Sequence, residues 1–233
     1  MRAFESACRR VGNELIEAIR VSGRCDAVTD LGEPFAARIP CAFLGWPEAM
    51  TELLRYRQEA NRRVMGDPTD RLRRERVEGR PSSDEIGSIV RNWTVGELDT
   101  IAASVGIVLH ALAHDPDLQA RLRAEPKREA AAIDEALRVR GPLIANRRVA
   151  TRDVELAGQP VRAGDRVRVL WPSANRDERV FEAPEEIRLD RSPHDDLFFG
   201  AGSTSARARR RLAWSFAFWS RSCWHARVPF RCD

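Results

Sequence analysis

Apolar residues recur with the spacing of amphipathic helices through much of the first 140 residues. This pattern predicts a helix over residues 1–21 that ends near Gly23, a second amphipathic segment over 47–65, and a long helix from Ser83 to Ala113. Residues 66–83 are charged and rich in turn-forming residues, which predicts a surface linker or an exposed helix flanked by loops. The first part of the chain is therefore expected to be helical.

The pattern changes after Gly141 and Pro142. Two shorter helices are predicted before this point, at Pro116–Ala124 and Pro126–Arg140. After it, short segments rich in β-forming residues alternate with turn-forming ones. The predicted strands are 147–150, 154–156 and 167–170, and the predicted turns are 158–160 and 163–165. Irregular structure is expected from Pro172 to Gly202. The fold class is therefore mainly α with a small antiparallel β region.

Composition narrows the class of protein. The chain has 233 residues, of which 43% are hydrophobic and 32% charged, as in globular proteins. Its longest apolar run, over 101–113, is too short to cross a bilayer, and the first ten residues lack the apolar core of a signal peptide. Five scattered cysteines do not indicate a disulfide framework or a zinc ribbon. We therefore expect a soluble, cytoplasmic protein without a membrane partner.

The positive charge is concentrated at one end of the chain. Residues 203–233 contain seven arginines and one acid, whereas the rest of the chain is net negative despite an overall charge of +4. The arginines and Trp214, Trp219 and Trp224 suggest an alternative function, a nucleic-acid-binding module in which the tryptophans stack on bases. The acidic body and the absence of a nucleic-acid-binding motif disfavour this alternative. A zinc site at Cys223, His225 and Cys232 would have too few ligands.

Several short motifs follow one another in a fixed order. Asp99 and Thr100 form an acid–hydroxyl pair within the long helix, and Glu135 and Arg138 lie three residues apart on the last helix. Each pair alone is also compatible with a solvated helix surface. The motifs that come later are Arg148, the segment Asn175–Arg191, and the sequence Phe199-Gly200-Ala201-Gly202.

This ordered series resembles the cytochrome P450 family over residues 1–202. The resemblance implies a partial cytochrome P450 fold, in which the long helix is the central helix over the haem. Glu135 and Arg138 are similar to the family's ExxR pair, and Arg148 is similar to the arginine that binds a haem propionate. Asn175–Arg191 resembles the family's meander. Phe199, Gly200 and Gly202 resemble the start of the haem-binding loop.

The resemblance also implies roles for these residues. The family inserts oxygen into small organic substrates, using haem held by a cysteine thiolate and electrons from an electron-transfer protein. Asp99 and Thr100 would deliver protons to bound dioxygen. Glu135, Arg138 and Arg191 would form a buried, structural charge cluster. Glu97 and Leu98 stand where the family has small residues, so a solvated helix surface remains the alternative for the Asp99–Thr100 pair.

The family's haem-ligating cysteine is missing. Ala206 stands in its place within Ser203-Thr204-Ser205-Ala206, which predicts that the chain as written has no metal ligand there and is inactive. Loss of one base after the codon for Gly202 would convert codons for Ile-His-Phe-Cys into this sequence. We therefore expect residues 203–233 to be a frame-shifted, unstructured tail. Early family helices have no counterpart, so the resemblance also implies that the chain is a C-terminal-half fragment of a bacterial, soluble member of the family.

Overall fold

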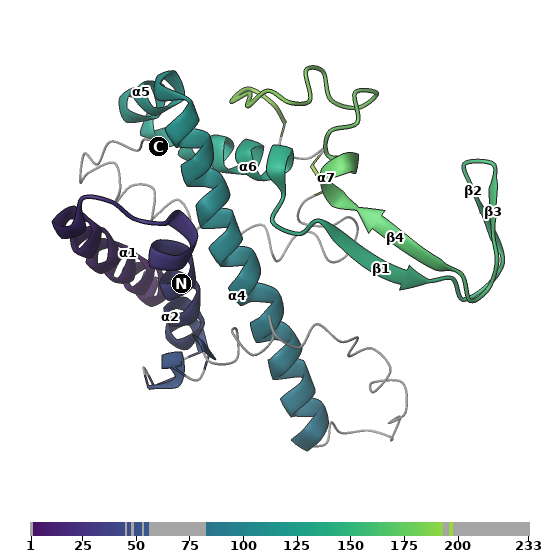
Figure 1. The fold of residues 1–233 in the computed structure, drawn as a ribbon, viewed down its shortest axis with the longest axis horizontal. Coiled ribbons are helices and arrows are strands. Elements are labelled where there is room, and N and C mark those ends of the chain that lie inside the picture. Colours follow the sequence, from purple (N-terminus) through teal and green to yellow (C-terminus); the bar gives the residue numbers. More distant parts are fainter. Residues whose placement is uncertain are drawn as a thin grey trace. The chain divides into compact units, whose positions relative to one another are not determined.

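A computed structural model describes residues 2–44, 46–47, 49–52, 54–55, 83–192 and 196–197 (Figure 1). Its elements are mainly helices, with two small antiparallel sheets, as the sequence predicts. The chain divides into two compact units whose boundary falls between Gly106 and Ile107, inside the longest helix. The two units are considered separately below.

The first unit begins with α1 (Arg2–Ser22), which ends at Gly23 as predicted. Gly23 has a φ of +74°, a conformation that glycine adopts at little cost. The chain then forms η1 (Ala27–Gly32), a π-helix, and α2 (Glu33–Leu44). Sequence analysis did not identify these two helices. Pro40 lies inside α2 and would ordinarily indicate a break, but burial of apolar residues such as Phe35 and Ile39 outweighs the cost of the proline.

The long helix α4 (Ser83–His114) confirms the predicted helix and extends it by one residue. Its residues Leu98, Ile101, Ala102 and Val105 are buried in the core. At Gly32 the backbone of η1 approaches α4 so closely that an added Cβ would lie 2.6 Å from the carbonyl oxygen of Ala102. Glycine is therefore required at this crossing.

The second unit contains the predicted shorter helices. Asp115 caps α5 (Pro116–Ala124), because its carboxylate accepts a hydrogen bond from the backbone N–H of Leu118 at 2.8 Å. The chain continues through the short 3-10 helix η3 (Pro126–Arg128) into α6 (Glu129–Arg140). These elements confirm the two helices expected between Pro116 and Arg140.

Two antiparallel ribbons follow α6. β1 (Ala145–Val149) pairs with β4 (Arg166–Leu170), and β2 (Val154–Leu156) pairs with β3 (Gln159–Val161). The predicted turn at 158–160 is wrong, because β3 already begins at Gln159.

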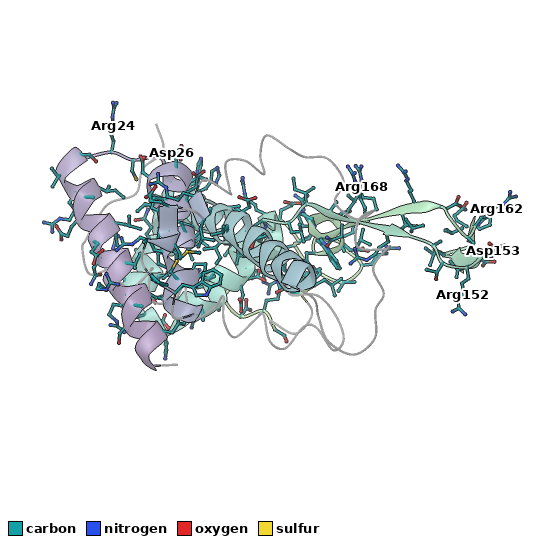
Figure 2. The ribbon with its side chains drawn as sticks, turned by 90° about the horizontal axis from the view of Figure 1, so that it is seen from below. Arg24, Asp26, Arg152, Asp153, Arg162 and Arg168 are labelled. Carbon is teal, nitrogen blue, oxygen red and sulfur yellow. The ribbon has the colours of Figure 1, made fainter. Side chains whose placement is uncertain are left out.

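The turn consists of only two residues, Ala157 and Gly158, which have φ values of +50° and +78°. Pro160 is opposite Glu155, next to the Leu156–Gln159 pair that closes the hairpin. In such an alternating ladder this is a position that requires no N–H donor, so proline is tolerated there. Figure 2 shows Arg152 and Arg162 extending away from this hairpin.

A short helix, α7 (Trp171–Ala174), includes Pro172, so the prediction of irregular structure is wrong for residues 172–174, where a turn of helix continues from β4. Residues 175–192 contain no helix or strand, as predicted for the meander. Most of the predicted 47–65 segment, the 66–82 linker and the whole 203–233 segment lie outside the described residues. The same applies to the zinc candidates Cys223, His225 and Cys232. Among the helices that the structure describes, none is long and apolar enough to cross a membrane.

Candidate functional site

Glu135 and Arg138 form a buried ion pair on α6. The side chain of Arg138 is 1% exposed and that of Glu135 is 8% exposed. Two roughly parallel contacts join them: Nε to Oε1 at 2.8 Å and Nη2 to Oε2 at 3.0 Å. This bidentate geometry is specific to the planar guanidinium of arginine. The expectation that both residues are buried together is confirmed.

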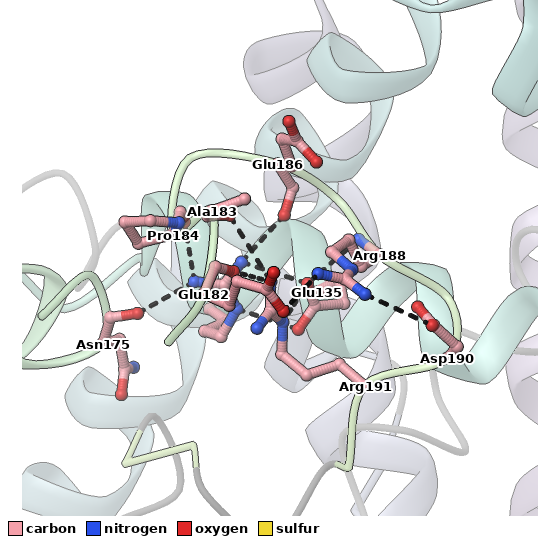
Figure 3. A network of polar contacts seen from close by, with 10 residues as sticks. Glu135, Asn175, Glu182, Ala183, Pro184, Glu186, Arg188, Asp190 and Arg191 are labelled. Atoms are coloured by element: carbon pink, nitrogen blue, oxygen red, sulfur yellow. Dashed lines mark hydrogen bonds and ion pairs between the residues drawn. The ribbon is translucent and has the colours of Figure 1, made fainter. Parts of the chain in front are cut away.

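Arg138 also binds the meander through its remaining donors. Nη1 donates to the carbonyl oxygens of Asn175 at 2.9 Å and Pro184 at 2.8 Å, and Nη2 donates to that of Glu186 at 2.9 Å (Figure 3). Together with the two bonds to Glu135, these contacts use all five N–H donors of a guanidinium. One side chain thus fixes three points of a segment that has little regular secondary structure of its own.

The carboxylate of Glu135 binds the same segment from the acceptor side. Its Oε2 accepts a hydrogen bond from the backbone N–H of Arg188 at 3.1 Å and another from Nε of Arg191 at 3.2 Å. The expected contact of the pair with Arg191 is therefore confirmed. Arg191 also donates to the carbonyl oxygen of Glu182 at 2.9 Å.

Phe181 lies against both guanidinium groups of this cluster. Its side chain is 2% exposed, and its ring centroid lies 5.0 Å from Cζ of Arg138 and 5.7 Å from Cζ of Arg191. The negative face of an aromatic ring attracts cations. Because the cluster contains two arginines and one carboxylate, the ring and the carbonyl oxygens stabilise the excess positive charge. Sequence analysis noted Phe181 only as part of the meander.

Asp99 and Thr100 lie on α4 in the first unit, where both are half-buried. The neighbouring Leu98 is 1% exposed, so this residue packs into the core. The hydroxyl of the buried Ser104 donates to the carbonyl oxygen of Thr100 at 2.6 Å. A hydroxyl bound to the preceding helical turn in this way can bend a helix. The acid–hydroxyl pair is therefore partly shielded by protein, and its predicted role in proton delivery stays a prediction.

Arg148 lies on β1, opposite Val167 of β4. Its side chain is exposed and donates to the carbonyl oxygen of Arg147 at 2.9 Å. Because side chains alternate along a strand, Arg148 is on the opposite face of the ribbon from Arg147. An exposed guanidinium of this kind can bind a carboxylate such as a haem propionate, but that role is not tested by these contacts.

An open cavity of about 1000 Å³ lies in the second unit, between the last two turns of α4 and the meander. His110 and His114 line it, with their rings stacked at a centroid distance of 4.0 Å. Nδ1 of His110 is buried without a hydrogen-bond partner. Burial, together with the positive charges of Arg140 and His114, lowers the pKa of His110 below its ordinary value. Nothing in the sequence pattern had indicated this cavity.

The remaining predicted site residues, Phe199, Gly200, Gly202 and Ala206, lie outside the described residues. Three cysteines are described: Cys8 and Cys41 are buried, Cys25 is exposed, and all three are free thiols. Partial desolvation, together with the nearby carboxylates of Asp30 and Asp26, raises the pKa of the Cys25 thiol, which disfavours its thiolate. The absence of cysteine from the segment that resembles the haem-binding loop is a property of the sequence, which reads Phe199-Gly200-Ala201-Gly202 followed by Ser203-Thr204-Ser205-Ala206.

Comparisons with known proteins agree with this geometry. The family model for cytochrome P450 matches residues 50–194, which include Asp99, Glu135, Arg138 and Arg191. A probable cytochrome P450 127A1 of Sinorhizobium fredii is 30% identical over 97% of this chain and 61% of its own length. That alignment takes in nearly the whole chain and so extends beyond residue 202. CYP199A2 of Rhodopseudomonas palustris is 36% identical over 53% of this chain and 30% of its own length.

Solved structures show the same fold. The crystal structure of cytochrome P450 CYP101C1 is 30% identical, with a TM-score of 0.78, over 96% of this chain and 64% of that one. The crystal structure of CalO2 is 26% identical, with a TM-score of 0.81, over 98% of this chain and 65% of that one. The chain thus spans about three fifths of the length of the first relative and of these structures. The family model, the ordered motifs and the buried ExxR pair together show that this chain belongs to the cytochrome P450 family of haem-dependent monooxygenases.

Proposed function

We propose that this chain derives from a monooxygenase that inserts oxygen into a small organic substrate and receives electrons from an electron-transfer protein. The observation that carries the proposal is the buried Glu135–Arg138–Arg191 cluster within the family match. Such a cluster is costly to bury unless every charge is paired and hydrogen-bonded. Its contacts with residues 175–191 support a structural role, which is to hold the meander, rather than a role in the chemical step.

The proposed residues for oxygen chemistry and haem binding lie elsewhere. Asp99 and Thr100 are proposed to hold and move protons toward dioxygen, because a carboxylate and a hydroxyl are adjacent at a half-buried point of α4. Arg148 is proposed to bind a haem propionate through its exposed guanidinium. The family's haem supplies the oxygen-activating chemistry when it is bound through a thiolate.

The chain as written does not fit a haem-thiolate centre. Ala206 offers no ligand atom at the position where the family has its cysteine. Of the three described cysteines, Cys8 and Cys41 are buried and Cys25 is exposed; all three lie in the first unit and far from position 206 in the sequence. We therefore propose that the 233-residue chain does not catalyse the family reaction. We also propose that Asp99, Thr100 and Arg148 keep positions that suit proton delivery and haem binding.

A change of reading frame after Gly202 is our proposal for the missing ligand. One restored base would place cysteine at position 206 and a glycine at position 208, as in the family's loop. The alignment with the Sinorhizobium fredii relative extends past residue 202, so the reading frame beyond that point is tested directly on the gene. The measurement is the nucleotide sequence across codons 202–216. A cysteine codon at position 206 in the neighbouring reading frame would support the proposed frame change, and its absence would contradict it.

The carbon-monoxide difference spectrum of the reduced protein tests the proposed function. The unrepaired chain is expected to give no thiolate-type band, because a haem iron needs a sulfur within bonding distance. Restoring one base after codon 202, in a gene that encodes a chain of the full length of the relatives, is expected to produce that band.

The matched control for this spectrum is the same restored gene with alanine kept at position 206. Retained colour alone would not count, because haem can bind weakly to apolar surfaces. A thiolate-type band from the unrepaired chain would show that another cysteine reaches the iron, and the proposal for Ala206 would be wrong. Absence of the band from the restored gene would contradict the proposed function itself.

A further inference from the structure

Asn175 is a buried polar residue that follows α7 and forms hydrogen bonds with two separate parts of the chain. It is 1% exposed. Its backbone carbonyl oxygen accepts a hydrogen bond from Nη1 of Arg138. Asn175 is labelled in Figure 3, where a dashed line marks this bond. Its side chain contacts a different segment: Oδ1 accepts from the backbone N–H of Leu197 at 2.8 Å, and Nδ2 is 3.4 Å from Oδ1 of Asp196. A single residue thus joins the buried Glu135–Arg138 pair to residues 196 and 197.

The orientation of the Asn175 amide follows from its partners. A backbone N–H can only donate, so the atom facing Leu197 must be the oxygen. A carboxylate oxygen accepts, so the atom facing Asp196 is the nitrogen. The bond to Leu197 has an ordinary length, whereas 3.4 Å to Asp196 is long for this kind of bond. The contact with Leu197 therefore contributes most of the attachment.

Asp196 and Leu197, the two residues that Asn175 contacts, come shortly before the sequence that resembles the start of the haem-binding loop. Leu197 is followed by Phe198 and then by Phe199-Gly200-Ala201-Gly202, which resembles the start of the haem-binding loop. In general, fixing the residue at which a chain segment begins reduces the conformational entropy that the segment must lose when it is ordered. The partners of Asn175 lie 21 and 22 residues beyond it in the chain, so the contact is tertiary rather than part of a local turn.

We propose that Asn175 is a positioning residue that fixes Leu197, the residue that precedes Phe198 in the sequence, relative to the buried Glu135–Arg138 pair. Arg138 holds the backbone of Asn175, and the Asn175 side chain holds the backbone of Leu197. The effect on haem ligation rests on the proposed function, whereas the attachment of Leu197 does not. The test of the attachment can therefore be made on the 233-residue chain itself.

Amide hydrogen exchange of Leu197, resolved residue by residue by NMR, is the first measurement. Asn175→Ala removes the acceptor and is expected to speed exchange at this amide by about tenfold, the change that corresponds to loss of one ordinary hydrogen bond. Asn146→Ala is the matched control. It removes another asparagine whose Oδ1 accepts one side-chain bond, from Nε1 of Trp171 at 2.6 Å, and should leave Leu197 exchange unchanged.

A double variant that exchanges the amide of Asn175 and the carboxylate of Asp196 distinguishes loss of this contact from a general loss of stability. Asn175→Asp keeps an acceptor for Leu197 but places a second carboxylate against Asp196. Adding Asp196→Asn restores a donor and an acceptor in swapped positions, so the double variant should recover slow Leu197 exchange. Unchanged exchange in Asn175→Ala would overturn the proposal. So would an acceleration shared equally by the amides of α6, since that pattern indicates global unfolding.

The consequence for haem ligation is measured separately, in the frame-restored gene of the relatives' full length. There, Asn175→Ala is expected to reduce the fraction of haem that shows the thiolate-type carbon-monoxide band, and the double exchange is expected to recover it. If the restored protein gives no such band with Asn175 intact, the proposed function fails while the exchange result still decides the role of Asn175. If the band is insensitive to Asn175→Ala although Leu197 exchange accelerates, the positioning of the loop is refuted.

Discussion

Neutralising Glu135 provides the sharpest test of the buried cluster. Glu135→Gln keeps the shape of the side chain but removes the charge that faces Arg138 and Arg191. The wild-type carboxylate accepts four hydrogen bonds, and three of them reach Oε2. In the variant, an NH₂ group would replace one oxygen and face donors. The buried guanidinium of Arg138 and the partly buried one of Arg191 would then lack their only described carboxylate partner in the cluster.

The magnitude follows from burial. Removing one partner of a buried ion pair costs about 3–5 kcal/mol, because the other charge stays buried and uncompensated. A typical domain has a free energy of unfolding of about 5–15 kcal/mol, so the variant should lose a large part of it. In a frame-restored, full-length protein, Glu135→Ala is expected to abolish soluble expression, because it also leaves a cavity.

The chain contains a matched control for this experiment. Glu125 and Arg128 have the same spacing of three residues and a similar contact distance, 2.7 Å against 2.8 Å, but their side chains are 43% and 41% exposed. Glu125→Gln should therefore change stability little, because water and salt screen an exposed pair. Urea unfolding followed by far-ultraviolet circular dichroism compares the two variants. Equal and small shifts in the urea midpoint would refute the argument from burial.

Three further changes test other parts of the structure. Arg138→Lys keeps the charge but supplies three N–H donors in place of five, so it should lower the free energy of unfolding by at least about 2 kcal/mol. Urea titration measures this change, and an unchanged midpoint would contradict the importance of the bidentate contact with Glu135. Gly32→Ala would bring a Cβ against the backbone of Ala102 and should cost about 1–3 kcal/mol in thermal unfolding, whereas a neutral result would mean that the crossing can relax. His110 has a lowered pKa, so the folded state binds fewer protons than the unfolded state below the ordinary value of 6.5. Stability should fall as the pH drops below that value, and His110→Gln should weaken this dependence when unfolding is measured across the pH range; an identical slope would exclude His110 as its source.

Sequence periodicity alone predicted the elements that depend on local forces. The long helix, the end of α1 at Gly23 and the start of α5 at Asp115 and Pro116 match the structure because apolar spacing, glycine and a capping carboxylate act within a few residues. The strand at Gln159 was missed for a related reason. Gly158 and Pro160 both favour turns, and only the pairing with β2 decides that the turn ends at Gly158.

The features of the candidate site also divide into those set by the sequence and those set by tertiary contacts. The sequence by itself determined the order of the motifs and the absence of cysteine at position 206, because these are properties of residue identity and spacing. It did not determine that α2 tolerates Pro40, that Phe181 lies against two guanidinium groups, or that Asn175 binds Leu197. Those outcomes depend on contacts between segments that lie far apart in the chain. Burial then sets their strength, since the Glu135–Arg138 and Glu125–Arg128 pairs look alike in sequence and differ in exposure to water.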